Sequence, residues 1–376
     1  MISSAALPLA RTYAGLRVLV TGHTGFKGSW LSLWLSGLGA EVAGVSDIVP
    51  TQPAAYHWFG PAAVKRDFRC DIRNAEGIAS IVAEWRPDVI FHLAAQPIVI
   101  QAARDPLGTF AVNVIGTAAV LEAARKTSSV RAVLVVTSDK VYANDNAGRA
   151  FVEADTLGGH EPYGASKAAA EIVAATYRSA GFHAGAGSSN VPAVATARAG
   201  NVIGGGDWAA NRLIPDAVRA IVAQEPIVIR SPHATRPWQH VLEPVGGYLL
   251  HAQALLADSA TAPAALNFGP DDKTARSVSD VIRLFLDEMK PWTTELVISE
   301  NTTGLESKTL MVDSSLAHEV LGWSPSWSWS EAVTRVAQWH RAHLAGDVDL
   351  VDLARRQIED YCTASAVPAF RSGGSV

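Results

Sequence analysis

The sequence predicts an α/β protein, built on a doubly wound parallel sheet with a smaller α+β lobe toward the C-terminus. Short apolar runs alternate with amphipathic segments through the first two thirds of the chain, as expected of parallel strands joined by crossover helices. The run at 131–137 is apolar on both faces, which is typical of a strand that helices cover above and below. A glycine-rich turn also follows the first strand and opens a helix.

The elements are predicted in chain order. Strands are expected at 17–20, 41–45, 88–95, 131–138 and 193–202, with helices in the gaps. After Gly204 the expected order is a helix at 212–224, a strand at 227–230, a helix at 245–257, a strand at 265–268, a helix at 278–289, a strand at 295–299, and helices at 315–321 and 330–344. The segment 180–190 is predicted as a flexible loop and 364–376 as a frayed tail.

These elements suggest four parts of the chain. Residues 1–15 are expected to form an N-terminal arm, and 16–204 to form most of the sheet domain. Residues 205–345 are expected to form most of the smaller lobe, with some segments returning to the core, and 346–376 a C-terminal helix and tail.

Composition excludes several classes of partner. The net charge of -5 and pI near 6.1 provide no basic surface for nucleic acid or an anionic membrane. Local arginines at 212, 230 and 236 could still hold a small anionic ligand. Cys70 and Cys362 are far apart and lack metal-ligand spacing, so neither a disulfide framework nor a metal site is indicated. No run approaches ~18 consecutive apolar residues, and we expect no signal peptide, no membrane span and a cytoplasmic location.

The turn after the first strand reads Thr-Gly-His-Thr-Gly-Phe-Lys-Gly at 21–28. Backbone amides and the helix dipole at such a junction favour a pyrophosphate, and glycines let the backbone approach it. The alternative is a tight turn whose glycines serve packing alone. The strand and helix on either side favour phosphate binding. The loop residues assigned to the cofactor are Gly22, Thr24, Gly25, Phe26 and Gly28.

The Gly-x-x-Gly-x-x-Gly spacing resembles that of the extended short-chain dehydrogenase/reductases, which have a Rossmann-like fold and bind NAD or NADP. Asp47, after the second strand, is the candidate for the adenosine ribose, although it could equally be a solvated loop acid. No arginine in that short stretch would hold a 2′-phosphate, so NAD is preferred. The resemblance also assigns Asp71 and Ile72 to the adenine, and Ala94, Ala95, Gln96 and Asn113 to the cofactor.

Tyr163 and Lys167 are four residues apart in a helical pattern and therefore share one face. There the lysine can hold the nicotinamide ribose and lower the pKa of the tyrosine from ~10. Such a pair is also common on helix surfaces. With Ser138 at a strand end about 25 residues earlier, we predict that the serine binds the reacting oxygen while Tyr163 takes its proton. This is alcohol oxidation at a nicotinamide.

Asp139 and Lys140 follow Ser138 directly. Nucleotide-sugar 4,6-dehydratases of this family have a proton-transfer pair there, which simple reductases and epimerases usually lack. On this interpretation Asp139 donates a proton to the departing C6 oxygen and Lys140 removes the C5 proton. Lys140 then needs a strongly lowered pKa, and it could instead act through water or stabilise the enolate. The pair could also be a surface salt bridge.

Longer motifs extend the resemblance over roughly 16–344 and point to the CDP-glucose branch of these dehydratases. They are Thr-Ser-Asp-Lys-Val-Tyr at 137–142, Arg-Ala-Gly-Asn-Val-Ile-Gly-Gly-Gly-Asp-Trp at 198–208, Arg-Leu-Ile-Pro-Asp at 212–216 and Arg-Pro-Trp-Gln-His-Val-Leu-Glu at 236–243. The resemblance implies CDP-glucose as substrate, deoxysugar biosynthesis, and a homodimer through a four-helix interface. The residues it assigns to the substrate are Asn201, Arg212, Leu213, Arg236 and His240, although His240 could be only a helix cap or a packed core residue.

Two other functions remain open from the sequence. A nucleotide-sugar 4-epimerase or reductase would use Ser138, Tyr163 and Lys167 and ignore the pair at 139–140. A cofactor-sensing regulator would bind NAD without chemistry, and the retained tyrosine argues against it.

Overall fold

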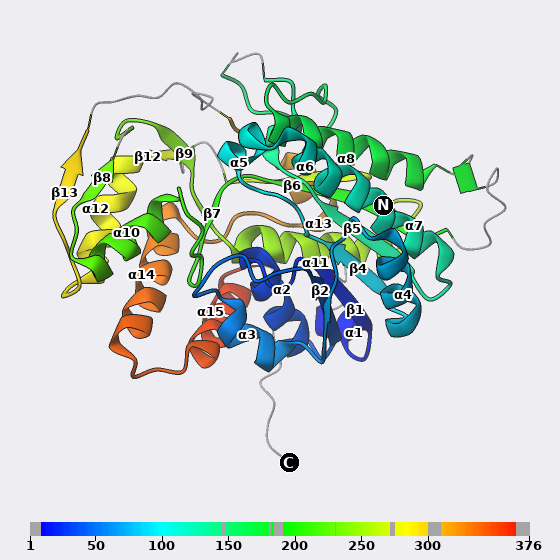
Figure 1. Cartoon of the computed structure of the whole chain (residues 1–376), viewed down its shortest axis with the longest axis horizontal. Coiled ribbons are helices and arrows are strands. Elements are labelled where there is room, and N and C mark those ends of the chain that lie inside the picture. Colours follow the sequence, from blue (N-terminus) through cyan, green and yellow to red (C-terminus); the bar gives the residue numbers. More distant parts are fainter. Residues whose placement is uncertain are drawn as a thin grey trace.

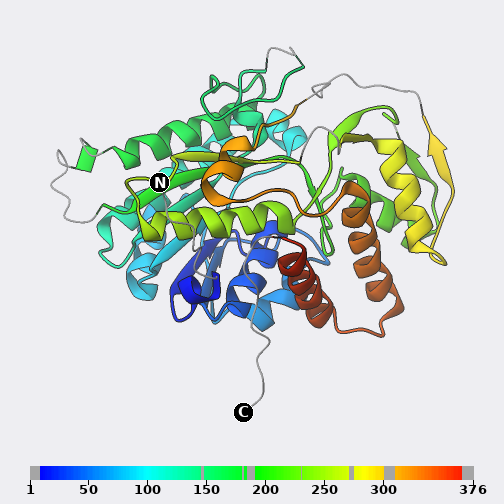
Figure 2. The same ribbon diagram turned by 180° about the vertical axis from the view of Figure 1, so that it is seen from behind.

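The computed structural model describes residues 9–144, 148–179, 182–183, 191–229, 231–270, 275–299 and 310–365. Most of the loop predicted at 180–190, the end of the predicted tail and Arg230 lie outside the described residues. Figure 1 shows a central sheet with helices on both faces and a smaller group of elements beside it, and Figure 2 shows the same arrangement from behind.

The central sheet has seven strands in the order β11-β6-β5-β4-β1-β2-β3, and every neighbouring pair is parallel. The order reverses between β1 and β4, as in other doubly wound nucleotide-binding sheets. Its strands are β1 (Arg17–Thr21), β2 (Glu41–Ser46), β3 (Arg66–Arg69), β4 (Val89–His92), β5 (Ala132–Val136), β6 (Ala193–Ala199) and β11 (Ala265–Phe268). The predicted fold class is therefore confirmed.

Alternate strand residues divide the core into two layers. Leu19, Val133 and Val135 pack with one set of helices, whereas Val20 and Leu134 pack with the other. The first set includes α4 (Ala75–Trp85), α7 (Gly116–Lys126) and α8 (Pro162–Arg178), with α5 (Val99–Arg104), α6 (Pro106–Phe110) and the π-helix η1 (Ala111–Ile115) beside them. The second set includes α1 (Leu9–Tyr13), α2 (Phe26–Gly37), α3 (Tyr56–Ala63), α11 (Leu242–Ala257) and α15 (Leu350–Ala364).

The smaller group of elements lies to the left of the sheet in Figure 1 and to the right in Figure 2. It contains α10 (Leu213–Ala223), α12 (Val278–Met289), α14 (Trp329–Ala345) and the strand pairs of β8 (Ile227–Ile229) with β13 (Leu296–Ile298) and β9 (Thr235–Pro237) with β12 (Ala275–Ser277). The remaining elements are β7 (Val202–Ile203), β10 (Gln239–His240), α13 (Ser315–Leu321) and the 3₁₀-helix η2 (Asp139–Val141). Local signals define their ends: α14 begins with a Ser328–Glu331 capping box and ends at Gly346 with φ 70°.

Two expectations need correction. The segment 9–13, predicted as part of a loose arm, is helix α1, and Tyr13 is fully buried with its hydroxyl donating to the Leu249 carbonyl at 2.7 Å. Strand β3 was not predicted, because three of its four residues are exposed. Strand β11 lies after Gly204 in the chain and pairs with β6 in the main sheet, so it is one of the segments that return to the core.

One helical stretch, Pro106–Lys126, is long and apolar enough to cross a membrane by length and composition alone. Half of its most apolar part is buried inside the fold, and its helices pack against α4 and α8. We therefore assign it to the protein core.

Buried histidines make stability depend on pH. Burial lowers the pKa of His340 to about 3, and within the described part of the chain neither of its ring nitrogens has a hydrogen-bond partner. The unfolded residue titrates near 6.5, so the neutral form stabilises the fold fully above that pH. This contribution is lost as pH falls from 6.5 toward 3, by about 1.4 kcal/mol per pH unit.

We therefore expect His340→Phe to reduce the loss of unfolding free energy between pH 6.5 and 5 by about 2 kcal/mol. The ring would keep its contacts with Trp208, Trp339 and Phe285. Urea unfolding at both pH values measures the difference. An identical pH dependence in the variant and the wild type would contradict the assignment.

Candidate active site

The glycine loop joins β1 to α2 at the carboxyl edge of the sheet. A Cβ at Gly22 would lie 2.7 Å from the Ala94 amide nitrogen, and one at Gly28 would lie 2.2 Å from the Gly22 carbonyl oxygen. Gly25 caps α2 without a side-chain hydrogen bond, which leaves the first helical amides available. Gly22 and Gly28 are therefore required by close contacts within the protein backbone, whereas the free amides at the start of α2 fit the predicted phosphate.

The other two loop residues assigned to the cofactor also have contacts inside the protein. Thr24 donates its hydroxyl to the Ile48 carbonyl at 2.7 Å. Phe26 lies so close to Gly204 that a Cβ there would be 2.8 Å from the ring. Both residues therefore join the loop to neighbouring segments.

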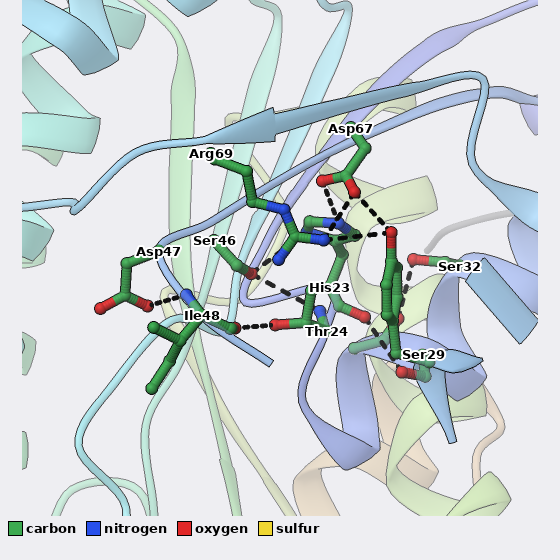
Figure 3. Close-up of polar contacts among 11 residues, drawn as sticks. His23, Thr24, Ser29, Ser32, Ser46, Asp47, Ile48, Asp67 and Arg69 are labelled. Atoms are coloured by element: carbon green, nitrogen blue, oxygen red, sulfur yellow. Dashed lines mark hydrogen bonds and ion pairs between the residues drawn. The ribbon is translucent and has the colours of Figure 1, made fainter. Parts of the chain in front are cut away.

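Figure 3 shows a polar network at the ends of β2 and β3. His23 contacts Ser46 Oγ at 3.1 Å through Nδ1 and Asp67 at 3.0 Å through Nε2. Arg69 donates to the Asp67 carboxylate at 2.6 Å and stands opposite Ser46 in the strand register. Asp47 is exposed, accepts from the Ile48 amide at 2.8 Å, and is directed away from His23 and Asp67.

This arrangement corrects one step of the sequence interpretation. The stretch after β2 contains no arginine. However, Arg69 of the unpredicted strand β3 lies beside Ser46, the last residue of β2. The lack of a nearby arginine is therefore not a valid reason to prefer NAD. Asp67 and Tyr56 both bond to this guanidinium, and Asp47 remains a proposed ribose contact.

Asp71 and Ile72 lie just beyond β3. Asp71 is partly exposed and forms a 2.5 Å ion pair with Arg73, which holds the pKa of the carboxyl below its usual value. Ile72 is buried, and a Cβ at Gly116 would lie 2.5 Å from its side chain. The pair therefore lies at the predicted edge of the sheet, with Ile72 packed under the start of α7.

Asn113, in the π-helix η1, connects two parts of the site. Its Oδ1 accepts from the Gln96 amide at 2.8 Å, and its Nδ2 donates to Ser166 Oγ on α8, also at 2.8 Å. Ala94 and Ala95 precede Gln96 in the loop after β4, and the Ala94 amide donates to Thr21 Oγ1 at 3.1 Å. Asn113 therefore positions this loop and the catalytic helix through contacts inside the protein.

Ser138, Asp139 and Lys140 lie where β5 ends and η2 begins. Ser138 Oγ donates to Asp139 Oδ1 at 3.0 Å and accepts from the Lys140 amide at 3.2 Å. Burial raises the pKa of Asp139, while Lys140, Ser138 and Lys27 oppose the rise. Asp139 is buried, so the alternative of a surface salt bridge is wrong. Among the described residues, no cation lies within ion-pair distance of its carboxylate.

Tyr163 and Lys167 share the buried face of α8. Lys167 Nζ donates to the Val136 carbonyl at 3.1 Å, and burial lowers the pKa of this lysine to about 8. Burial raises the pKa of Tyr163 to about 12, against the opposing effects of Ser138 and Arg212. The expected lowering of the tyrosine pKa is therefore wrong for the structure as it stands, because desolvation of the phenolate outweighs the nearby positive charge.

A buried ion pair between Glu171 and Arg198 lies next to Lys167 along α8. Glu171, one helical turn after Lys167, accepts from Arg198 of β6 at 2.9 Å through both carboxylate oxygens and from Thr137 at 2.5 Å. Arg198 also donates to the Tyr142 hydroxyl at 2.9 Å. The network therefore fixes α8, β5 and β6 relative to one another.

We expect Arg198→Met to lower the unfolding free energy by about 3–5 kcal/mol, because it leaves Glu171 charged and buried without its ion-pair partner. Arg66→Met is the matched control: Arg66 also forms an ion pair, with Glu84, but both side chains are 56% exposed. Its loss should cost about 1 kcal/mol or less. Equal costs in chemical denaturation would contradict this role for Arg198.

The residues assigned to the substrate come from several different elements. Arg212 caps the N-terminus of α10, bonds to Asp207 at 3.3 Å, and lowers the pKa of both Tyr163 and Lys27 by its positive charge. Leu213 follows it, and Asn201 is exposed just after β6. Arg236 lies on β9 with its guanidinium donating to the Thr235 carbonyl at 2.9 Å.

The assignment of His240 to the substrate is wrong. Its side chain is fully buried between Trp30 and Trp327, with ring centroids 5.8 and 5.0 Å away. Burial lowers its pKa to about 3. It is a packed core residue, which was the alternative left open by the sequence.

Sequence reasoning missed Lys27 as a member of the site. It lies on the first turn of α2 and its ammonium is 3.4 Å from the Tyr248 hydroxyl of α11. Its positive charge opposes the rise in the pKa of Asp139 that burial causes. Its place inside the glycine motif was the available signal.

The arrangement combines a phosphate-binding loop, a Ser–Tyr–Lys group suited to alcohol oxidation, and a buried carboxyl suited to proton donation. A model of the GDP-mannose 4,6 dehydratase family matches residues 19–336. The chain is 39% identical over 353 residues to a CDP-glucose 4,6-dehydratase of Salmonella typhimurium, covering 94% of this chain and 98% of that protein. It is 34% identical to a UDP-glucose 4-epimerase of Mycolicibacterium smegmatis over 43% of this chain and 51% of that protein.

Solved structures show the same fold. A UDP-glucose 4-epimerase of Thermotoga maritima superposes with a TM-score of 0.72 at 22% identity, covering 88% of this chain and 100% of that chain. MoeE5, solved in complex with UDP-glucose and NAD, superposes with a TM-score of 0.72 at 25% identity, covering 87% and 99%.

Proposed function

The chain belongs to the GDP-mannose 4,6 dehydratase family, and on that premise we propose that it converts CDP-D-glucose to CDP-4-keto-6-deoxy-D-glucose with NAD. It is a nucleotide-sugar 4,6-dehydratase, a hydro-lyase. The observation that carries the choice of dehydration is the buried Asp139 beside Ser138, at the end of β5. The near full-length similarity to a CDP-glucose 4,6-dehydratase supports the substrate.

The residues at the loop fit NAD. Gly22 and Gly28 let the turn close on itself, and the unbonded first amides of α2 would donate to a pyrophosphate. Lys167 would bond to the nicotinamide ribose. Bound NAD supplies a hydride acceptor for the sugar C4 and a hydride donor for C6.

In the oxidation step, Tyr163 removes the proton of the C4 hydroxyl while Ser138 bonds to that oxygen. The pKa of Tyr163, about 12, must fall for this role, and the positive charge of Arg212 lowers it. Next, Lys140 takes the C5 proton, made acidic by the C4 carbonyl. Asp139 donates its proton to the departing C6 oxygen, and burial favours the protonated carboxyl that this step requires.

The decisive experiment incubates the purified protein with CDP-glucose and NAD and follows the alkaline absorbance of a 4-keto-6-deoxy sugar. Mass spectrometry should show loss of one water from the nucleotide sugar. UDP-glucose and dTDP-glucose in parallel reactions test the nucleotide. A product of unchanged mass with inverted C4 would instead identify an epimerase and exclude the proposed dehydration.

We also propose a homodimer through α8 and the helices around η1. Apolar side chains are exposed there, including Leu107 at 83%, Ile115 at 59% and Ile172 at 61%. Exposed apolar groups gathered on adjacent helices are typical of a protein interface. The resemblance to dimeric family members supports this surface.

Ile172→Glu should therefore convert the dimer to a monomer, because the interface would have to bury an unpaired charge. Light scattering after size exclusion measures the mass. Val222→Glu, on α10, is the matched control, since Val222 is also 61% exposed but lies outside the proposed interface. Two variants of identical mass would contradict the proposed surface.

We propose a cytoplasmic enzyme of deoxysugar biosynthesis, such as that of lipopolysaccharide O-antigens. We also propose that 16–204 mainly binds NAD and 205–345 mainly binds the nucleotide sugar. The position of Arg212 at the start of α10 supports the second assignment.

A further inference from the structure

Tyr142 is the last residue of the Thr-Ser-Asp-Lys-Val-Tyr motif at 137–142 and has no role in the steps described above. It caps the 3₁₀-helix η2 at its C-terminal end, two residues after Lys140. Its ring is buried and stacks on Phe151 with the ring centroids 4.9 Å apart. Its hydroxyl donates to Asn267 Oδ1 of β11 at 2.7 Å and accepts from Arg198 of β6 at 2.9 Å. A tyrosine held by both its ring and its hydroxyl fixes this end of the turn.

Both partners of this hydroxyl are themselves held in place. Asn267 is fully buried, and its Nδ2 donates to the carbonyls of Phe151 at 2.9 Å and Asp313 at 3.0 Å. Arg198 belongs to the buried ion pair between α8 and β6 that is described above. These partners hold the Tyr142 hydroxyl to one position, because a buried hydroxyl that moved away would lose both of its hydrogen bonds.

The other end of the turn is anchored by the same ion pair. Thr137 donates its hydroxyl to Glu171 at 2.5 Å and its backbone amide to the Ala197 carbonyl at 2.9 Å. Glu171 is in turn paired with Arg198. The ion pair therefore contacts the residue before and the residue after the segment 138–141, which carries the groups proposed for oxidation and proton transfer.

The segment between these two anchors is closely packed. A Cβ at Gly164, next to Tyr163 on α8, would lie 2.7 Å from the Lys140 carbonyl oxygen. A Cβ at Gly200, which follows β6, would lie 2.8 Å from Oδ2 of Asp139. The Lys140 backbone and the Asp139 carboxylate therefore lie directly against the backbones of two other elements. A shift of the turn would change the positions of both residues relative to Tyr163.

We propose that Tyr142 is a positioning residue for the dehydration, and that its hydroxyl holds Asp139 and Lys140 where they reach the C6 oxygen and the C5 proton of the sugar. This inference rests on the proposed function. Ser138, which serves the oxidation, directly follows Thr137, the anchor at the start of the turn. A displacement of about 1 Å can reduce the rate of a catalysed step by about 100-fold. Loss of the Tyr142 hydroxyl should therefore slow the elimination of water more than the oxidation of C4.

Hydrogen exchange of the full chain, measured by mass spectrometry without added ligands, tests whether this hydroxyl holds the turn. Tyr142→Phe keeps the ring that stacks on Phe151, and it leaves Arg198 bonded to the Glu153 carbonyl at 3.0 Å, so the variant should fold. The amides of a peptide covering 137–142 should exchange about tenfold faster than in the wild type, as expected when one buried hydrogen bond is lost.

Tyr13→Phe is the matched control. Tyr13 is also fully buried, and its hydroxyl donates to the Leu249 carbonyl at 2.7 Å between α1 and α11, so its loss should leave exchange at 137–142 unchanged. Circular dichroism verifies folding. If Tyr142→Phe is unfolded, Arg198→Lys replaces it, because lysine keeps the charge of the ion pair but lacks the forked group that also reaches Tyr142. Exchange at the wild-type rate would overturn the proposal.

Single-turnover kinetics with NAD and CDP-glucose gives a readout that a general loss of stability would not change. In Tyr142→Phe, reduced nicotinamide should form at nearly the wild-type rate and then disappear about 10- to 100-fold more slowly, because elimination is delayed. Tyr13→Phe should match the wild type in both phases. Equal slowing of both phases, or slowing of neither, would leave Tyr142 without a positioning role. Absence of dehydration in the wild type would defeat the proposed function, whereas hydrogen exchange would still decide whether Tyr142 holds the turn.

Discussion

An Asp139→Asn variant is expected to bind NAD and oxidise C4 largely as the wild type does. It should catalyse the loss of water from the sugar at least about 100-fold more slowly. Asparagine has nearly the shape of the buried carboxyl and can accept the hydrogen bond from Ser138, which lies 3.0 Å from Asp139 in the wild type. It cannot donate an acidic proton to the departing C6 oxygen. Only the elimination step should therefore suffer.

Single-turnover mixing with CDP-glucose tests this separation of steps. Absorbance of the reduced nicotinamide should appear, while the alkaline absorbance of the 4-keto-6-deoxy product should not. Asp287→Asn is the control, because this α12 carboxylate is 70% exposed and remote from the sheet edge. Normal turnover by Asp139→Asn would remove this residue from the mechanism.

Lys140→Met is expected to abolish exchange of the sugar C5 hydrogen with solvent. Methionine keeps much of the aliphatic length of lysine but cannot take a proton, so the C5 hydrogen should stay in place after C4 has been oxidised. Lys140 is partly exposed and its amide is fixed by the Ser138 hydroxyl at 3.2 Å, which holds the start of η2 without requiring the side chain. The backbone should therefore tolerate this substitution.

Reaction in deuterium oxide, followed by NMR of the recovered sugar, measures the exchange. Reduced nicotinamide should still form, which shows that C4 oxidation survives. Exchange that persists in Lys140→Met would place the base elsewhere, and Lys27 is then the first residue to substitute. Loss of exchange in Lys140→Met but not in Lys27→Met would assign removal of the C5 proton to Lys140.

The strands of the sheet were predictable where burial on both faces leaves a continuous apolar run. The five residues of β5 are all buried, and the predicted range 131–138 contains them. Strand β3 has no such run: Arg66, Asp67 and Arg69 are exposed at the sheet edge, and the strand is defined by its pairing with β2. A single strand at an edge leaves a weak pattern in the sequence.

The site was predictable where local spacing specifies it. The glycines of one turn and the Tyr163–Lys167 pair of one helix need only their own element to be placed. Contacts between distant segments were not predictable in this way. Arg69 reaches the end of β2 from an unrecognised strand, and His240 is enclosed by two tryptophans far away in the chain. The polarity of a histidine gives no sign of such packing.

The π-helix η1 makes the position of Asn113 depend on the number of residues in this segment. Its wider turn accommodates an additional residue within Ala111–Ile115, and Asn113 lies in the middle of it, bonded to both Gln96 and Ser166. Deleting one residue here would restore an ordinary helix and rotate the side chains before or after the deletion by about 100° relative to one another. Asn113 could then no longer face the loop and α8 together. For this segment, the number of residues matters as much as their identity.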